Sequence, residues 1–164
     1  MADVTRTLDV PVEQRFDFWK ATLAESFVPL EVTRPGNSAD FRGELTGFDL
    51  GTVRMREVKA GPHTALRTRR LVSAAPSGCY KLGLMQGGSA VLTQDGREAV
   101  LGPGDFALYD TDRPYTLDSI LLIYFRKSFR RWCFVLCPYS LHDMVKGFLM
   151  KPTLKILTFF QVEL

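Results

Sequence analysis

The chain has 164 residues, of which 46% are hydrophobic and 24% charged, and its formal net charge is +3. These values are typical of one globular domain with a hydrophobic core, so they exclude disordered and collagen-like classes. The three cysteines have no regular spacing, which excludes a disulfide framework and favours a reducing compartment.

The N-terminal part of the chain predicts one helix. Pro11 suits the first turn of a helix because its missing N–H would have no partner there. Phe16, Trp19 and Leu23 then recur at helical spacing and give one apolar stripe, which continues to about Glu25. We therefore expect a single helix that packs through this stripe.

We expect no secretory signal before that helix. The first ten residues contain two aspartates and lack the apolar segment of a secretory signal. No uncharged apolar run in the chain reaches the roughly 18 residues of a membrane-spanning helix. We expect a cytoplasmic protein without a membrane partner.

Short β-rich runs follow the helix and are separated by turn signals. Asp95-Gly96 is the strongest of these signals for a tight hairpin, and Pro103-Gly104 marks another turn. Many short strands with frequent turns predict a mainly β fold, a cupin-like jelly roll or β-barrel behind an N-terminal packing helix. The predicted strands are Phe27–Thr33, Phe41–Phe48, Thr52–Val58, Ala65–Val72, Cys79–Met85, Ser89–Gln94, Glu98–Leu101 and Phe106–Tyr109.

The chain resembles cupins in the spacing around Gly104 but lacks their metal-binding side chains. Aligned on the two cupin motifs, Arg67 and Arg69 occupy two histidine positions, Tyr80 the carboxylate position and Tyr115 the last histidine position. A mononuclear metal centre needs three or four imidazole and carboxylate ligands. We therefore expect no metal, no cofactor and no metal-dependent catalysis.

The same four residues are candidates for binding a small ligand at the barrel mouth. Arg67 and Arg69 lie two apart on a predicted strand, so they would face the same side, and their guanidinium groups suit a carboxylate or phosphate. The alternative is that both arginines are solvated charges on an edge strand, which is the commoner situation of such residues. Tyr80 and Tyr115 complete the candidate site, although a tyrosine after a proline is more often a packing residue.

The last part of the chain differs in composition from the rest. Residues 119–164 hold seven Lys and Arg against two Asp and Glu, whereas residues 1–118 hold fourteen against sixteen. The tail has no alanine and a single glycine. We expect one strand at residues 120–125 and no defined element after it.

Several segments resemble the N-terminal domain of AraC-type transcriptional regulators, over about residues 8–118. The resemblance is carried by Arg67-Thr68-Arg69-Arg70, Tyr80–Leu84, Asp95–Leu101, Pro103–Asp110 and Arg113-Pro114-Tyr115, and by the helix at residues 12–27. It implies a domain that binds a small effector or dimerises and has no catalytic residues. In that family DNA is bound by a separate C-terminal pair of helix-turn-helix motifs, which residues 119–164 do not resemble.

Two hypotheses follow from the resemblance and the change in composition. The first is an effector-binding and dimerising regulator domain without its DNA-binding half, through truncation or a frameshift near residue 119. The second is a free-standing, metal-free cupin that binds a small molecule, either as a binding protein or as an enzyme. An acid–base site would need a carboxylate inside the barrel, and the nearest candidates are Asp110 and Asp112 in a turn.

Overall fold

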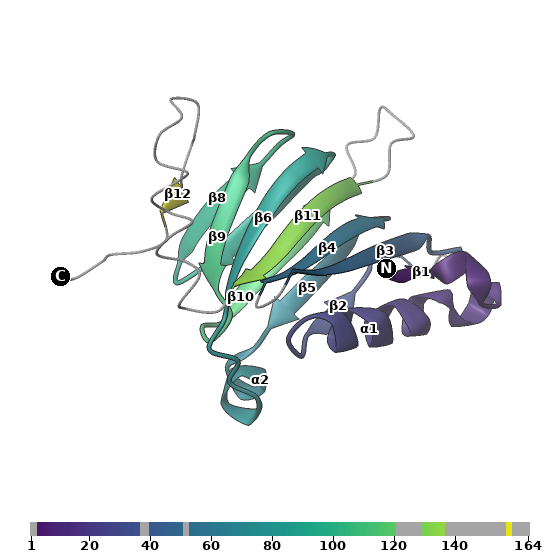
Figure 1. Ribbon diagram of the computed structural model, residues 1–164, viewed down its shortest axis with the longest axis horizontal. Helices are drawn as coiled ribbons and strands as arrows, with labels where there is room; N and C mark the ends of the chain where they lie inside the picture. The colour runs from purple at the N-terminus through teal and green to yellow at the C-terminus, as the bar shows by residue number, and fades with distance from the viewer. Residues whose placement is uncertain (1–2, 37–39, 51–52, 121–128, 137–156, 159–164) are drawn as a thin grey trace.

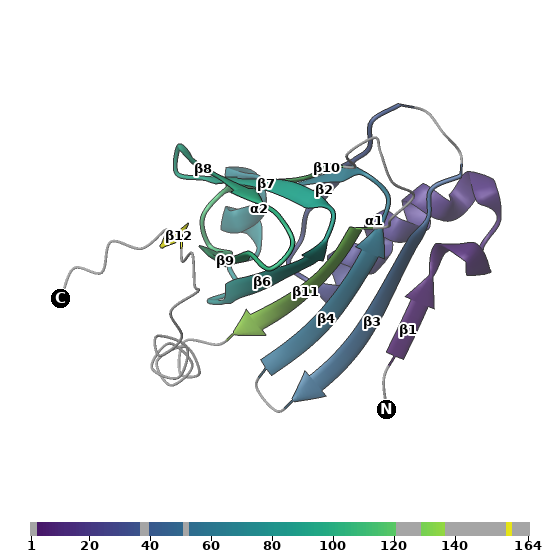
Figure 2. The same cartoon turned by 90° about the horizontal axis from the view of Figure 1, so that it is seen from above.

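The computed structural model describes residues 3–36, 40–50, 53–120, 129–136 and 157–158. Two β-sheets face each other (Figures 1 and 2). The N-terminal helix lies next to the smaller sheet and packs on the face of the larger sheet that is turned toward the smaller one. The mainly β, cupin-like prediction with an N-terminal packing helix is thereby confirmed. No helix in the described part of the chain is long and apolar enough to cross a bilayer.

Over the described residues, the larger sheet has seven strands. Its order is β1 (Asp3–Arg6), β3 (Gly43–Leu50), β4 (Val53–Ala60), β11 (Phe129–Leu136), β6 (Tyr80–Gly87), β9 (Phe106–Asp110) and β12 (Leu157–Thr158). All neighbours are antiparallel except β9 and β12.

The smaller sheet has five antiparallel strands in the part of the chain that the structure describes. Its order is β2 (Glu31–Thr33), β5 (His63–Arg67), β10 (Tyr115–Ile120), β7 (Ser89–Gln94) and β8 (Arg97–Leu101). The hairpin between β7 and β8 turns at Asp95 and Gly96, whose φ angles are 52° and 72°. Positive φ at both positions is the geometry of the tight turn that this dipeptide predicts.

The N-terminal helix α1 (Arg15–Ser26) follows two short 3-10 helices, η1 (Thr7–Asp9) and η2 (Val12–Gln14). Pro11 precedes η2, so the helical segment begins where the sequence predicts. Trp19 and Leu23 of the predicted stripe are buried in one cluster, to which Phe16 adds its ring. The helix packs through this face onto the larger sheet.

Buried residues form two clusters. The helix core lies between α1 and the larger sheet, and the barrel core lies between the two sheets. The helix core contains Trp19, Leu23, Val32, Phe41, Leu45, Val58 and Ala60. The barrel core contains Met85, Ala90, Leu92, Ala99, Leu101, Ala107, Tyr109, Tyr115 and Leu117.

Several described elements differ from the sequence prediction, among them β10 (Tyr115–Ile120), since no strand was predicted before residue 120. The predicted strand Ala65–Val72 is wrong in its second half, since β5 ends at Arg67 and helix α2 spans Arg69–Ala74. The cause is local, because the Thr68 hydroxyl accepts the Leu71 N–H and caps this helix. The sequence also predicted no strand before the helix, where β1 lies, and no element over residues 129–136, where β11 pairs with β4 and β6. Of the strand predicted at 120–125, residue 120 ends β10 and the others lie outside the described residues.

Candidate functional site

The inside of the barrel is lined by every second residue of the strands around it. In β6 the inward residues are Lys81, Gly83 and Met85, and the register places Lys81 opposite Tyr109 of β9. Many inward positions carry small side chains, which leaves the few larger ones to shape the interior. The small residues are Ala65, Gly83, Ala90, Ala99 and Ala107.

A buried lysine and two tyrosines form the polar centre of this interior. Lys81 is 2% exposed, and its Nζ donates a hydrogen bond of 3.1 Å to the Tyr115 hydroxyl. The same ammonium lies 4.5 Å from the centroid of the Phe27 ring, a cation–π contact. Tyr109 packs edge-on against Tyr115, with 4.8 Å between the ring centroids. We refer to Lys81, Tyr109, Tyr115 and Phe27 as the lysine cluster.

The chemistry of the lysine cluster is that of an anion or acceptor site with aromatic walls. An ammonium group has three N–H donors and no acceptor. Removing such a charge from water is costly unless polar partners surround it. The positive charge of Lys81 would attract a ligand carboxylate or carbonyl, while the apolar part of the ligand would contact the rings.

Arg67 lies beside this cluster and holds the barrel mouth together. Its guanidinium is fully buried and donates to three carbonyl oxygens, of Pro29 at 2.9 Å, Ala75 at 2.6 Å and Thr111 at 3.2 Å. These carbonyls belong to the segment after α1, the end of α2 and the turn after β9. Arg67 therefore joins three segments that are far apart in the sequence.

The structure brings only two of the four predicted site residues together. Tyr115 and Arg67 are directly opposite each other in the β10–β5 pairing. Arg69 is exposed on the first turn of α2, so the expectation that it shares a face with Arg67 is wrong, because the strand ends before it. Tyr80 is half-buried and lies on the opposite face of β6 from Lys81. A ligand-binding role of these four residues stays a prediction.

Sequence reasoning missed Lys81, Tyr109 and Gln94 as interior polar residues. Gln94 is buried, and its amide bonds both the N–H and the carbonyl of Asp110. The available signal was the period of β6, which places Lys81 on the same face as Gly83 and Met85.

The two aspartates considered for acid–base chemistry lie in the turn at the mouth. The Asp112 carboxylate accepts the Ser77 N–H and the Gly78 N–H, both at 2.7 Å, and the Ser77 hydroxyl at 2.9 Å. Burial acts to raise the pKa of Asp112, but these hydrogen bonds outweigh it and hold the pKa below its usual value. The Asp110 carboxylate accepts the Asp112 N–H at 2.8 Å. Both groups are thus used to build the turn.

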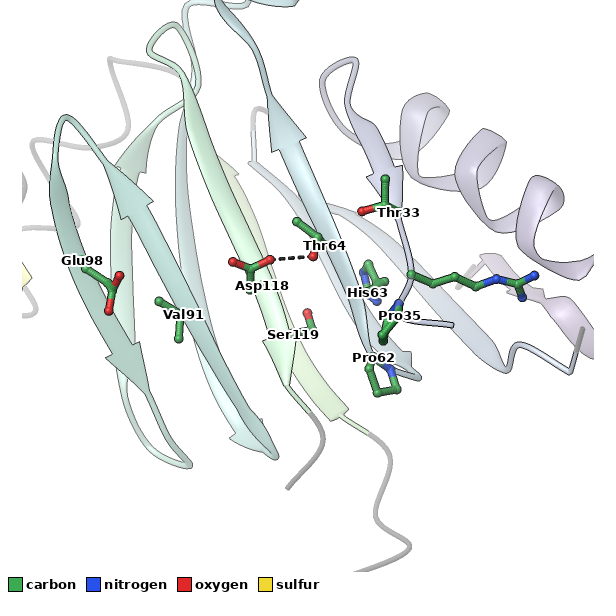
Figure 3. Close-up of a pocket in the computed structure, with 10 residues that line it drawn as sticks. Thr33, Pro35, Pro62, His63, Thr64, Val91, Glu98, Asp118 and Ser119 are labelled. Carbon is green, nitrogen blue, oxygen red and sulfur yellow. Dashed lines mark hydrogen bonds between the residues drawn. The ribbon is translucent and has the colours of Figure 1, made fainter. Parts of the chain in front are cut away.

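A groove of about 770 Å³ is lined by residues of the smaller sheet and its neighbouring segments (Figure 3), and its lining residues do not include the lysine cluster. Its lining residues come from β2, β5, β10, β7 and β8 and from the segments at Pro35 and Pro62. No group of three or more His, Cys, Asp or Glu side chains is placed to hold a metal ion within the described residues.

The sequence of this chain is similar to a known domain family and to two known proteins. The sequence profile of the AraC-binding-like domain family matches residues 19–119. An uncharacterised protein from the nit 5′ region of Bacillus sp. (strain OxB-1) is 32% identical over 117 residues, which are 71% of this chain and 45% of the relative. The transcriptional activator NphR of Rhodococcus sp. is 30% identical over 115 residues, which are 70% of this chain and 34% of the relative.

A solved structure supports the fold. The AraC-like transcriptional activator CuxR superimposes with a TM-score of 0.74 at 23% identity, over 89% of this chain and 51% of that chain. This chain therefore spans about half or less of the length of these three proteins.

Proposed function

The chain belongs to the AraC-binding-like domain family and carries the effector-binding domain of an AraC-type regulator, and on this premise we propose that its effector binds inside the barrel at the lysine cluster. The observation that carries the proposal is the Lys81–Tyr115 hydrogen bond among buried aromatic rings. Lys81 is 2% exposed, and a buried positive charge in a barrel lined by small side chains suits a ligand with an anionic head group.

The chemical class of effector follows from the lining. The ammonium of Lys81 and the hydroxyl of Tyr115 favour a carboxylate or another anionic head group. Phe27 and Tyr109 favour a flat apolar or aromatic body of modest size. We propose a small aromatic or apolar organic acid.

The proposed role is sensing without turnover. Asp110 and Asp112 are held in the turn by hydrogen bonds, which argues against either acting as an acid or base inside the barrel. Ligand binding would act on transcription through DNA contacts made outside residues 19–119, in a cytoplasmic homodimer. The names of the relatives NphR and CuxR as activators support this role.

The test is a ligand screen on the full chain and two matched lysine variants. Small carboxylic acids, with benzoate as the first probe, are screened by thermal unfolding against wild type, Lys81→Met and Lys20→Met. Lys20 is a surface lysine of α1 paired with Asp17, so its replacement removes a cation without touching the barrel. An acid that raises the unfolding temperature of wild type and Lys20→Met, but not of Lys81→Met, supports the proposal.

A second variant separates the hydroxyl from the ring. Tyr115→Phe keeps the aromatic contact and removes the hydroxyl that accepts a hydrogen bond from Lys81. We expect about tenfold weaker binding of the same acid, corresponding to the loss of one hydrogen bond near a charge. Equal binding by wild type and Lys81→Met would contradict the proposed site, and release of a reaction product would contradict the sensing role.

A further inference from the structure

The inward face of β10 carries a polar side chain at each end. The residues of this face are Tyr115, Leu117 and Ser119, because every second residue of a strand lies on the same side and all three are buried. Tyr115 belongs to the lysine cluster, and Ser119 lies four residues farther along the strand. At about 3.3 Å for each residue, the Cα atoms of these two residues are about 13 Å apart. The barrel interior therefore has a second polar end.

The Ser119 hydroxyl at this second end has no partner. Ser119 is 6% exposed, and its Oγ makes no hydrogen bond with any described residue. The register places His63 of β5 on one side of it and Ala90 of β7 on the other. A buried hydroxyl without a partner is uncommon, because its desolvation is then not compensated. Ser119 therefore offers both a donor and an acceptor to a group inside the barrel.

The indole of Trp19 adds an independent observation at the same end. Trp19 is fully buried, and its Nε1 likewise has no hydrogen-bond partner among the described residues. Its ring lies edge-on to the imidazole of His63, with 6.0 Å between the ring centroids, and His63 is directly opposite Ser119. The unpartnered N–H and the unpartnered hydroxyl thus flank the same histidine. Since an indole N–H can only donate, this end of the barrel lacks an acceptor.

Small side chains line the barrel between its two polar ends. The inward positions halfway along β5, β6 and β9 carry Ala65, Gly83 and Ala107. Gly83 and Ala107 are directly opposite each other in the β6–β9 pairing. These side chains have at most one carbon atom, so they extend little into the barrel. A flat ligand whose head group is held at the lysine cluster can therefore extend toward Ser119.

We propose that the effector carries a hydroxyl group at the end remote from its acidic head, and that Ser119 and Trp19 bind this hydroxyl. The ligand oxygen accepts the Trp19 N–H, and the ligand hydrogen is donated to Ser119 Oγ. A hydroxyl both accepts and donates, so it matches an indole N–H and a serine together. The inference rests on the proposed function, because the acid must first be held at Lys81. It narrows the effector class to hydroxylated aromatic acids.

The test compares pairs of acids on the full chain by isothermal titration calorimetry. Benzoate, phenylacetate and phenylpropanoate, which increase in length, are each compared with their para-hydroxy derivative. We expect at least one para-hydroxy acid to bind about three- to tenfold more tightly than its parent, the gain from one additional hydrogen bond. In Ser119→Ala the parent acid keeps its affinity and this gain is lost. Ser73→Ala is the matched control, because Ser73 is exposed on α2, and it should keep the gain.

The stability of Ser119→Ala without ligand gives a second readout. The variant removes a buried hydroxyl that has no described partner, so the unfolding temperature should stay the same or rise. A hydroxyl with a structural partner would give the opposite result. A clear fall in the unfolding temperature, or misfolding of the variant, therefore overturns the inference.

The outcomes separate this inference from the proposed function. A gain in wild type and Ser73→Ala that is lost in Ser119→Ala supports the hydroxyl site. No gain in any pair, or an equal gain in Ser119→Ala, overturns it and leaves this end of the barrel to water only. The proposed function still stands in that case if the parent acids bind wild type and not Lys81→Met. Absence of binding by every acid, or binding that Lys81→Met does not change, contradicts the proposed function and overturns the inference with it.

Discussion

The helix core and the barrel core of this molecule differ in the kinds of side chain that they bury. The helix core is mostly apolar, and the rings of Phe16, Trp19 and Phe41 meet there with the imidazole of His63. The barrel core mixes small side chains with buried polar groups, among them Lys81 and Gln94. Large apolar residues stabilise most strongly when they are buried, whereas buried charges are often no better than hydrophobic replacements. The comparison suggests that the first core mainly stabilises the fold and that the second retains polarity for binding.

Truncation of the main side chain of the helix core should have the largest effect. Trp19 is fully buried, and its ring approaches the backbone so closely that a Cβ on Gly43 would lie 2.6 Å from Trp19 Cε3. We expect Trp19→Ala to lower the free energy of unfolding by about 3–5 kcal/mol, measured by chemical denaturation. Val100→Ala, at a position 68% exposed, is the control and should be nearly neutral. If Trp19→Ala lowered the free energy of unfolding by less than Tyr115→Phe does, the helix core would not be the more stabilising of the two cores.

Arg67 tests whether a buried polar residue beside the barrel core can also stabilise the fold. Arg67→Met keeps an unbranched side chain but leaves the carbonyls of Pro29, Ala75 and Thr111 without this donor. At about 1 kcal/mol for each lost hydrogen bond, we expect a loss of about 3 kcal/mol. Arg69→Met is the matched control and should change stability by less than about 0.5 kcal/mol, because Arg69 is exposed. Equal stability of the two variants would show that the carbonyl contacts contribute nothing.

The two arginines also illustrate what the sequence could predict. The helix and the β7–β8 hairpin were predictable, because apolar spacing and the Asp95-Gly96 turn are local signals. Arg67 is buried at the end of a strand and Arg69 is exposed on a helix because Thr68 caps that helix. This cap is a local signal, but it falls inside a segment whose sequence predicts a strand. The burial of Lys81 could not be derived from its residue type, because a lysine in an alternating strand is normally placed outside. Only the pairing of β6 with β9 places it opposite Tyr109.

The turn at the barrel mouth gives a smaller and pH-dependent effect. Asp112→Asn replaces one acceptor oxygen by an amide, which cannot accept the Gly78 N–H. We expect a loss of about 1–2 kcal/mol at pH 7. The pKa of Asp112 is lower in the folded than in the unfolded state, so its contribution is complete above the unfolded value of about 3.9 and is lost as the pH falls through the folded pKa. Denaturation at pH 7 and pH 3 should therefore show a difference between wild type and variant that shrinks in acid; a constant difference would assign the effect to shape alone.

Lys81→Met should have the smallest effect on stability and is the most direct test of the comparison. The variant removes a buried charge and keeps the length of the side chain, so the gain from avoiding desolvation offsets the lost hydrogen bond to Tyr115. We expect the free energy of unfolding to change by less than about 1 kcal/mol in either direction, measured by denaturation beside Trp19→Ala. A loss comparable with that of Trp19→Ala would make Lys81 a structural residue and remove the distinction between the two cores. A stable variant that no longer binds an acid would instead show that the barrel core keeps its lysine for the ligand.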